Sequence, residues 1–180
     1  MAMRWGCVRI VATVVCCVAV GCTDSTPPGA TSTQPLEPFL TLEEEIEFDY
    51  ISAWDAYFAA MADTDLGTAG MAEAATGQAL ETMRQRHTEH VNRGLSTVFP
   101  DPALRTHRIE ISSIDDFELT ATLVDCFTEN SFEQGANGVR FNEGASTGQW
   151  AVTVELEAGR WKPSRLELVS YWDGEQPTCD

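Results

Sequence analysis

The sequence predicts an α+β domain in which N-terminal helices pack on a curved antiparallel sheet. Apolar residues recur at helical spacing between Ile46 and Met61. From Ile109 onward the period changes, and apolar residues alternate with polar ones as they do in half-buried strands. Helices followed by a run of strands are typical of an α+β layer architecture, so we expect the sheet to pack on the long first helix.

The first helix is expected to begin after Thr41, which forms a capping box with Glu44 three residues later. An apolar stripe along its buried side reaches to about Ala62. The stripe contains Ile46, Tyr50, Trp54, Tyr57, Phe58 and Met61. Polar residues and glycines over 63–70 then end the helix.

Two further helices are predicted over 71–76 and 78–93, and the second of them carries a partial apolar set. Gly94 follows at a position where helices commonly end in a left-handed cap. Beyond it, Ile109 and Ile111 alternate with polar neighbours and mark the first strand.

The remaining pattern predicts an antiparallel meander. A turn over 115–116 is followed by a second alternating strand, which contains Phe117, Leu119, Ala121 and Leu123. Residues 133–148 hold four glycines and are expected to form a long, mobile crossing between strands. The last two strands are predicted over 150–156 and 161–172, with a turn at 158–159.

Residues 1–21 have the pattern of an export signal. Arg4 and Arg9 precede an apolar run over 10–20. This run is far shorter than the ~20 apolar residues of a membrane-spanning helix. The run ends in a small residue and Cys22, an arrangement that resembles the bacterial lipobox, whose cysteine is acylated and becomes the new N-terminus. We therefore expect Cys22 to be lipidated; an ordinary secretory signal cut nearby is the alternative.

The mature chain is strongly acidic. Without residues 1–21, nine basic and 28 acidic residues remain, a net charge of −19. This balance argues against nucleic acid as a partner, because its recognition depends on Lys and Arg. It also argues against adsorption to anionic lipid. Membrane contact is therefore expected through the lipid on Cys22, on the extracytoplasmic face of the cell membrane.

Beyond the signal, the chain divides into a tether and one domain. Residues 22–39 combine the lipidated cysteine with a disordered Ser/Thr/Pro-rich tether, and residues 40–180 match one domain of ordinary size. Cys126 and Cys179 are the cysteines that remain in this domain. An even pair in an exported domain indicates a disulfide bond. The alternative is two free thiols, with Cys126 buried as a small apolar residue.

The order of these elements is similar to that of a known superfamily. The segments that carry the likeness are YISAWDAY at 50–57, VDC at 124–126, WAVTV at 150–154, the Arg160-Trp161 pair and Cys179. The chain resembles the cone-shaped nuclear transport factor 2-like superfamily and, more closely, exported lipoproteins of high-GC Gram-positive bacteria that carry such a domain. The resemblance covers residues 40–180 and implies a cone-shaped fold and an exported location, without an activity.

The resemblance also nominates residues for a cavity site. Ketosteroid-isomerase-like and polyketide-cyclase-like members of the superfamily use Asp, Tyr or His inside the cone. Here the candidates are Tyr50, Trp54, Asp55, Tyr57 and Asp125. A carboxylate buried in an apolar pocket would have a raised pKa and would act as an acid or a base. The alternative is that the aromatic candidates are ordinary core and that Asp55 faces solvent.

Two further sets of residues have both a functional and a simpler structural interpretation. Trp150, Trp161, Tyr171 and Trp172 are candidates for lining a ligand cavity, although sheet core is favoured. His87 and His90 share a helix face as a metal pair would, but zinc-protease patterns need other spacings. No third ligand is evident, and no spacing selects His107, so a solvated polar helix face is expected there, with no metal and no cofactor.

Two functions follow from these observations. The first is a non-enzymatic binding or accessory domain, anchored to the membrane by lipid, which serves a partner protein or a small ligand through the open end of the cone. The second is a small-molecule enzyme of the isomerase, dehydratase or cyclase type, with Asp55 or Asp125 as the base.

Overall fold

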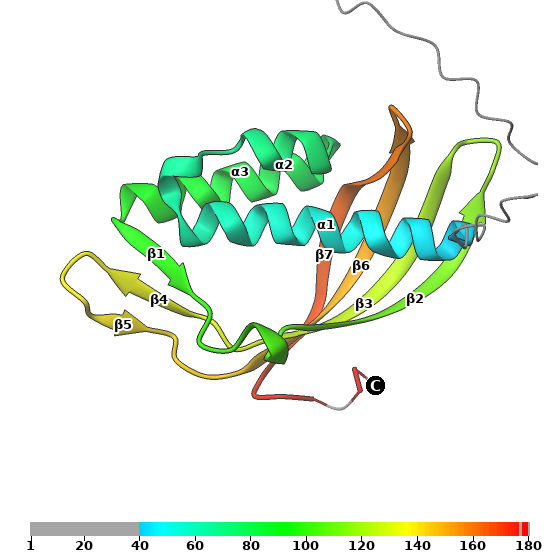
Figure 1. Cartoon of the computed structure of the whole chain (residues 1–180). Coiled ribbons are helices and arrows are strands. Elements are labelled where there is room, and N and C mark those ends of the chain that lie inside the picture. The colour runs from blue at the N-terminus through cyan, green and yellow to red at the C-terminus, as the bar shows by residue number, and fades with distance from the viewer. Residues whose placement is uncertain (1–39, 177, 180) are drawn as a thin grey trace, which may run out of the picture. The chain divides into compact units, whose positions relative to one another are not determined.

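The computed structural model describes residues 40–176, 178 and 179. The helices are α1 (Leu42–Ala62), α2 (Ala69–Ala74) and α3 (Gly77–Asn92), with short 3-10 turns at η1 (Thr64–Leu66) and η2 (Pro102–Leu104). The strands are β1 (Leu95–Val98), β2 (Thr106–Asp115), β3 (Thr120–Glu129), β4 (Phe132–Gly135), β5 (Arg140–Phe141), β6 (Ser146–Glu157) and β7 (Arg160–Asp173) (Figure 1). The predicted signal peptide, the lipidated Cys22 and the tether lie outside the described residues.

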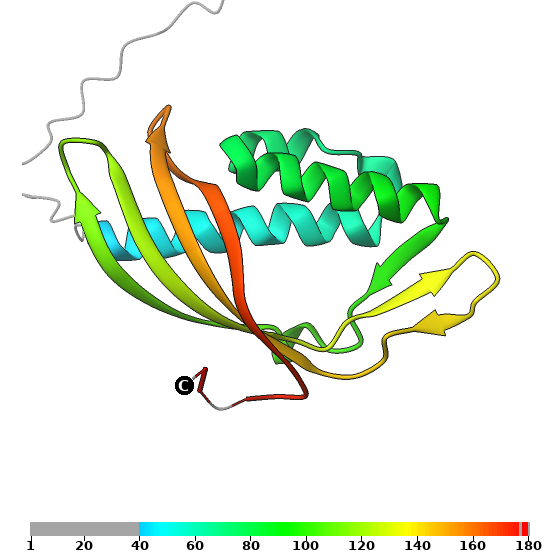
Figure 2. The same ribbon diagram turned by 180° about the vertical axis from the view of Figure 1, so that it is seen from behind.

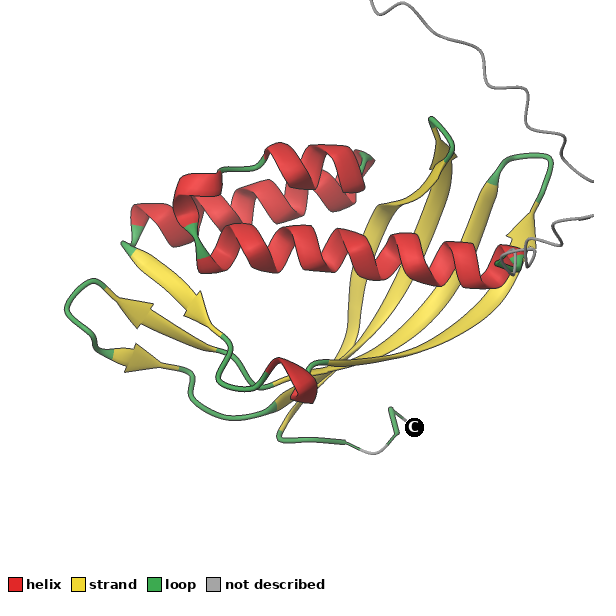
Figure 3. Ribbon diagram, in the orientation of Figure 1, coloured by secondary structure: helices red, strands yellow, loops and turns green. Residues whose placement is uncertain are grey.

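The strands of the described residues form two antiparallel sheets. The larger one has the order β2-β3-β6-β7, and the smaller one has the order β1-β4-β5. The larger sheet is curved, and the helices lie together on one side of it, with α1 running across its strands (Figures 1 and 2). Colouring by secondary structure separates this helical layer from the strands (Figure 3). The predicted α+β class, with N-terminal helices on an antiparallel sheet, is confirmed.

The start of α1 is fixed by the predicted capping box. The Thr41 backbone N–H donates to Glu44 Oε2 at 2.7 Å, and the Glu44 N–H donates to Thr41 Oγ1 at 3.2 Å. Such a cap stabilises a helix by about 1 kcal/mol. Acidic side chains at 43–45 add to this because the helix N-terminus carries a partial positive charge.

The core lies between the apolar stripe of α1 and the inner face of the larger sheet. From the helix come Ile46, Tyr50, Trp54, Tyr57, Phe58 and Met61, and from the sheet come Leu123, Phe127, Val152, Val154, Trp161 and Leu166. Asp49 ties the two layers together at one end. Its Oδ2 accepts from the Trp161 backbone N–H at 2.9 Å, and its Oδ1 accepts from Arg160 Nη2 at 2.9 Å.

Of the two tight turns in the larger sheet, one agrees with the prediction from the sequence and the other does not. Ala158 and Gly159 have φ of +54° and +79°, so the expected two-residue turn between β6 and β7 is confirmed. Phe117 and Leu119, by contrast, were expected in a strand and lie in the turn between β2 and β3. Phe117 is 96% exposed. The strand prediction failed here because it assumed that this apolar side chain is buried.

The expected long crossing over 133–148 is also wrong. This segment contains most of β4 and all of β5, and β4 pairs with β1 from Leu95 opposite Gly135 to Val98 opposite Phe132. The sequence missed this sheet because its strands are short. Gly138, with φ of +76°, provides the turn between β4 and β5 where a mobile loop was expected.

A disulfide bond joins Cys126 and Cys179, as expected from the even pair of cysteines. Their Cα atoms are 5.8 Å apart, and the bond closes a separation of 53 residues. Arg108 Nη2 lies 2.8 Å from Cys126 Sγ and donates to the Gln176 carbonyl at 2.8 Å. These contacts hold the C-terminal segment against the face of β3 that points away from the helices. Within the described part of the chain, no helix is both long enough and apolar enough to span a membrane.

Candidate functional site

Strand β3 presents two carboxylates on the same face. Alternate side chains of a strand point to the same side of its sheet, so Asp125 and Glu129 face α1 together with Phe127. Four residues along a strand correspond to about 13 Å. The two carboxylates therefore belong to separate environments under the same helix, one closed and one open.

The closed environment contains Asp125, Tyr50 and His107. The Asp125 side chain has no exposed surface. Its Oδ2 accepts from the Tyr50 hydroxyl at 2.9 Å and lies 2.6 Å from His107 Nδ1. Tyr50 comes from α1 and His107 from β2, so this cluster joins the long helix to two neighbouring strands. We call these three residues the core cluster.

Aromatic rings cover the core cluster. The His107 ring stacks on Phe127 with centroids 4.4 Å apart, and Trp54 stacks on the same phenylalanine at 5.4 Å. Burial, followed by the negative charge of Asp125, raises the pKa of Tyr50 well above its ordinary value. Tyr50 therefore keeps its proton and serves as a hydrogen-bond donor to the carboxylate.

One polar atom of the core cluster and one beside it have no hydrogen-bond partner in the described part of the chain. Asp125 Oδ1 and Trp54 Nε1 are both buried and have no hydrogen-bond partner among the described residues. A buried polar atom of this kind costs free energy, and a partly satisfied network costs more than a complete one. The two bonds to Asp125 Oδ2 offset this cost and fix how α1 sits on the sheet.

The open environment is a cavity of about 610 Å³ at the other end of α1. This volume lies within the usual range for small-molecule sites. Aromatic rings form much of its wall; they include Trp54, Tyr57, Phe58, Phe127, Phe132 and Trp150. The wall draws on α1, α3 and both sheets, because it lies where the chain passes from β3 into β4.

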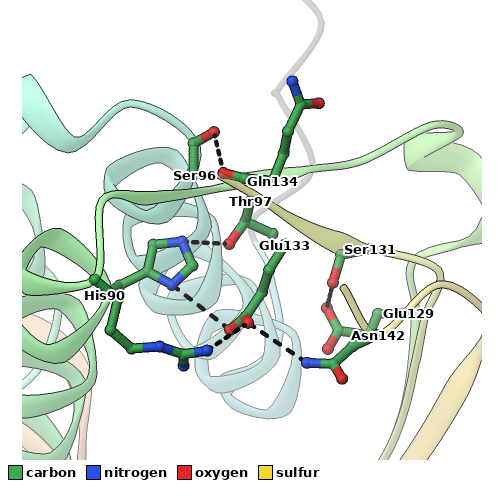
Figure 4. A network of polar contacts seen from close by, with 9 residues as sticks. His90, Ser96, Thr97, Glu129, Ser131, Glu133, Gln134 and Asn142 are labelled. Carbon is green, nitrogen blue, oxygen red and sulfur yellow. Dashed lines mark hydrogen bonds and ion pairs between the residues drawn. The ribbon is translucent and has the colours of Figure 1, made fainter. Parts of the chain in front are cut away.

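Glu129 is the carboxylate of β3 that faces this cavity. Ser131 Oγ donates to Glu129 Oε2 at 3.1 Å (Figure 4). Burial raises the pKa of Glu129, while the hydrogen bond from Ser131 and the charges of Arg105 and Arg86 lower it in part. A carboxyl group with a raised pKa takes up its proton at a higher pH than an exposed one, and its cavity position makes it available to a bound molecule.

Arg86 brings a positive charge from α3 to the same cavity. Its guanidinium carbon lies 5.9 Å from the centroid of the Trp150 ring. Burial raises the pKa of Tyr57, and the nearby Arg86 partly offsets that rise. Tyr57 therefore lines the cavity as a neutral hydroxyl group at physiological pH.

A polar network forms part of the cavity rim (Figure 4). Glu133 lies 3.7 Å from His90 Nδ1 and 3.6 Å from Arg93 Nη2, and it accepts from Asn142 Nδ2 at 3.4 Å. Thr97 Oγ1 lies 3.3 Å from His90 Nε2. The network links the end of α3 to β1 and β4, so it holds the smaller sheet against the helices.

The sequence predicted that the histidines of α3 lie on a solvated face, and this prediction is wrong. His87 is 6% exposed and His90 is 3% exposed. Burial lowers the pKa of His90, although the charge of Glu133 opposes this. The expectation failed because the smaller sheet, which the sequence did not reveal, covers this side of the helix. Among the described residues, no three His, Cys, Asp or Glu side chains are arranged to hold a metal ion.

The predicted cavity residues divide between the two environments. Trp54 and Tyr57 line the cavity, as proposed from the sequence. Tyr50 and Asp125 do not line it, because they bond to one another inside the core. Asp55 also lies outside the lining; its half-exposed side chain forms an ion pair with Arg105. These three assignments to the cavity are therefore corrected.

The aromatic candidates on the later strands divide in the same way. Trp150 and Tyr171 line the cavity, and Trp150 is also packed against the core. Trp161 is a core residue with 4% exposure. Trp172 is half-buried and is not part of the cavity wall.

Three important residues escaped the sequence analysis. His107 has no spacing that selects it, because its partner Asp125 comes from another strand. Arg86 is one of several charged residues on α3. Glu129 was accessible in principle, since strand alternation from Asp125 through Phe127 places it on the same face.

Comparisons with known proteins bear on the fold alone. Models of protein families and curated proteins give no match to this chain. Among solved structures, the intermembrane-space region of the chloroplast protein ARC6 aligns with a TM-score of 0.54 at 15% identity, over 73% of this chain and 98% of that chain. A protein from Xanthomonas campestris, described as a calcium/calmodulin-dependent protein kinase II association domain, gives a TM-score of 0.33 at 14% identity, over 71% and 85% of the two chains. The second value is too low to carry an argument, and the first supports an α+β likeness.

Proposed function

We propose that this chain is an exported lipoprotein whose cone-shaped, nuclear transport factor 2-like domain binds a small ligand. The lipid on Cys22 holds it on the extracytoplasmic face of the cell membrane, and the tether over 22–39 separates the domain from the lipid. The observation that carries the binding role is the cavity of about 610 Å³ with its aromatic wall.

Binding is favoured over chemistry because the His and Asp side chains that contact one another are enclosed in the core. His107 and Asp125 are 7% and 0% exposed at their side chains, and neither lines the cavity. A general base must come within hydrogen-bond distance of the proton it removes. The core cluster therefore acts as structure, and the cavity wall acts as the binding surface.

A second candidate function is a small-molecule isomerase, dehydratase or cyclase. Glu129 favours it, because a carboxyl group with a raised pKa lines the cavity. In this alternative Glu129 takes the role of base that the sequence suggested for Asp55 or Asp125. Turnover of a bound molecule that Glu129→Gln abolishes, with binding retained, would support the enzyme and count against a pure binding role.

The anchor is tested by labelling cells with radioactive palmitate and separating membranes from soluble protein. Label should appear on the wild-type chain in the membrane fraction, and Cys22→Ser should remove the label and release the protein. Cys17→Ser, a matched change inside the signal, should leave both unchanged. Release of the wild-type chain without label would contradict the anchor and favour an ordinary secretory signal.

The binding role is tested by native mass spectrometry of the protein purified without reductant from an oxidising compartment. A small molecule should accompany the protein and be lost on denaturation. Trp150→Ala should reduce its occupancy, and Trp172→Ala should not, because only Trp150 lines the cavity. Equal occupancy in both variants would place the molecule elsewhere.

A further inference from the structure

The charges around the cavity are unequal. Four carboxylates line it, from Glu129, Glu133, Glu143 and Asp173, against one guanidinium group, from Arg86. Arg93 lies 3.6 Å from Glu133, and Arg140 lies 3.8 Å from Glu143, so these two carboxylates have partners. Among the described residues, Glu129 and Asp173 have no Lys or Arg within ion-pair distance. The cavity therefore has unpaired negative charge.

The aromatic wall already attracts cations of the chain itself. Arg86 lies 5.9 Å from the Trp150 ring, Arg105 lies 5.1 Å from Phe58, and Arg140 lies 4.6 Å from Phe132. The face of an aromatic ring carries partial negative charge, and a cation over it gains about 0.5–1 kcal/mol when exposed and about 2 kcal/mol when desolvated. Three rings of the wall thus make this interaction in the free protein.

Tyr57 and Trp54 line the cavity together with Glu129, and among the described residues no guanidinium group lies over either ring. The two rings are neighbours, with centroids 5.8 Å apart and planes at 79° to one another. Tyr57 and Glu129 both line the cavity, and burial raises the pKa of Tyr57, with the charge of Arg86 lowering it and that of Glu129 adding to the rise. Perpendicular rings beside a carboxylate are a suitable environment for an alkylammonium group, which needs both a π-face and a counter-ion.

We infer that the cavity binds an organic cation with an apolar body, whose ammonium group contacts Trp54 and Tyr57 and is neutralised by Glu129. This inference rests on the proposed binding function and names its ligand class. Arg86 is the opposing charge, but its side chain is exposed and its field is screened by water and salt. The net charge of −19 on the mature chain also raises the local concentration of cations.

The inference is tested by calorimetric titration of the purified protein with three probes that share a benzyl body. Benzyltrimethylammonium is the cation, benzyl alcohol is neutral, and phenylacetate is the anion. The cation should bind at least about tenfold more tightly than either of the others, which corresponds to at least about 1.4 kcal/mol. Its affinity should fall as the salt concentration rises, because part of the attraction is electrostatic.

Glu129→Gln keeps the size of the side chain and an oxygen to accept from Ser131. The substitution should weaken the binding of benzyltrimethylammonium at least about fivefold and leave the affinity for benzyl alcohol unchanged. Glu110→Gln is the matched control, because Glu110 is an exposed residue of β2 that does not line the cavity, and it should change neither probe. Asp173→Asn, at an exposed position of the lining, provides a second test if Glu129→Gln does not fold.

The outcomes separate the inference from the proposed function. If phenylacetate binds as tightly as benzyltrimethylammonium or more tightly, the inference of a cationic ligand is overturned and the binding role remains. Tight binding of the cation that is insensitive to both Glu129→Gln and Asp173→Asn would overturn the assigned counter-ion. A co-purified molecule together with no binding of the cation would overturn the ligand class alone. No binding of any probe and no co-purified molecule would overturn both proposals.

Discussion

Asp125 and Glu129 occupy the same face of the same strand, and their surroundings differ in almost every respect. Asp125 is fully buried, and two side chains from other elements approach its Oδ2 within 3 Å. Glu129 is half-buried, faces the cavity and accepts one side-chain hydrogen bond, from Ser131. The carboxylate of Asp125 already binds two side chains of the protein, whereas that of Glu129 is available to bind a ligand in the cavity.

This difference distinguishes carboxylates that stabilise a fold from those that serve a ligand. Removing a buried charge whose partners are already in place leaves those partners unpaired in the core, and this lowers stability. A half-buried charge without an ion pair lowers stability by its desolvation and becomes favourable when a ligand pairs with it. Opposite effects of similar substitutions at the two positions would establish this distinction.

The largest expected effect is on the closed region. The Cys126→Ser, Cys179→Ser double variant should lose about 4 kcal/mol of stability, because the disulfide restricts a long loop of the unfolded chain. Binding of benzyltrimethylammonium should be unchanged at temperatures where the variant is folded. Urea unfolding and calorimetry measure the two quantities. A loss of binding in the folded variant would show that the outer face of β3 controls the cavity.

The next effect is expected at Asp125. Asp125→Asn should lose about 2 kcal/mol in urea unfolding, because the charged acceptor of Tyr50 and His107 is replaced by a neutral amide. Binding should persist, since this residue does not line the cavity. The matched change Asp115→Asn, in an exposed position at the end of β2, should cost less than about 1 kcal/mol. Loss of ligand binding with unchanged stability would make Asp125 a site residue after all.

A smaller loss is expected for Tyr50→Phe, which removes one hydrogen bond to Asp125 and keeps the ring in the core. We expect a decrease of about 1 kcal/mol. A double-mutant cycle with Asp125→Asn should show coupling between the two changes, because they affect the same bond. Strict additivity would contradict the hydrogen bond between Tyr50 and Asp125.

The smallest effect has the opposite sign. Glu129→Gln should raise stability by about 0.5 kcal/mol at pH 7, because it removes a desolvated charge. The pKa of Glu129 is raised on folding above its ordinary value of 4.5. Its contribution to stability is therefore present below pH 4.5 and is lost as the pH rises through the folded pKa. The difference between variant and wild type should grow over this interval and then level off. A constant difference would contradict a raised pKa.

The sequence was sufficient for the elements with strong local patterns. The capping box at Thr41 and Glu44 and the apolar stripe of α1 predicted a helix that begins and ends at the observed residues. The turn at 158–159 was equally clear. Short strands were not, because β1 and β4 have four residues each and β5 has two, too few for a period to emerge.

The candidate site was predicted only in part for a related reason. Trp54 and Tyr57 were found because helical spacing places them on the buried face of α1. His107 was missed because its role depends on Asp125, eighteen residues later, and on pairing between two strands that brings them together. Glu129 was missed because its exposure to a cavity depends on the smaller sheet, whose strands the sequence did not reveal.

The smaller sheet shares no strand with the larger one, and three connections join them, over 99–105, 130–131 and 142–145. Its place against the helices therefore depends on side-chain contacts, such as those of Glu133 with His90 and Arg93, and not on hydrogen bonds to the larger sheet. This side of the cavity is bounded by a wall with fewer backbone ties than the sheet around Asp125. Amide hydrogen exchange in β1, β4 and β5 should slow when a ligand occupies the cavity, while exchange in the strands around Asp125 should not change.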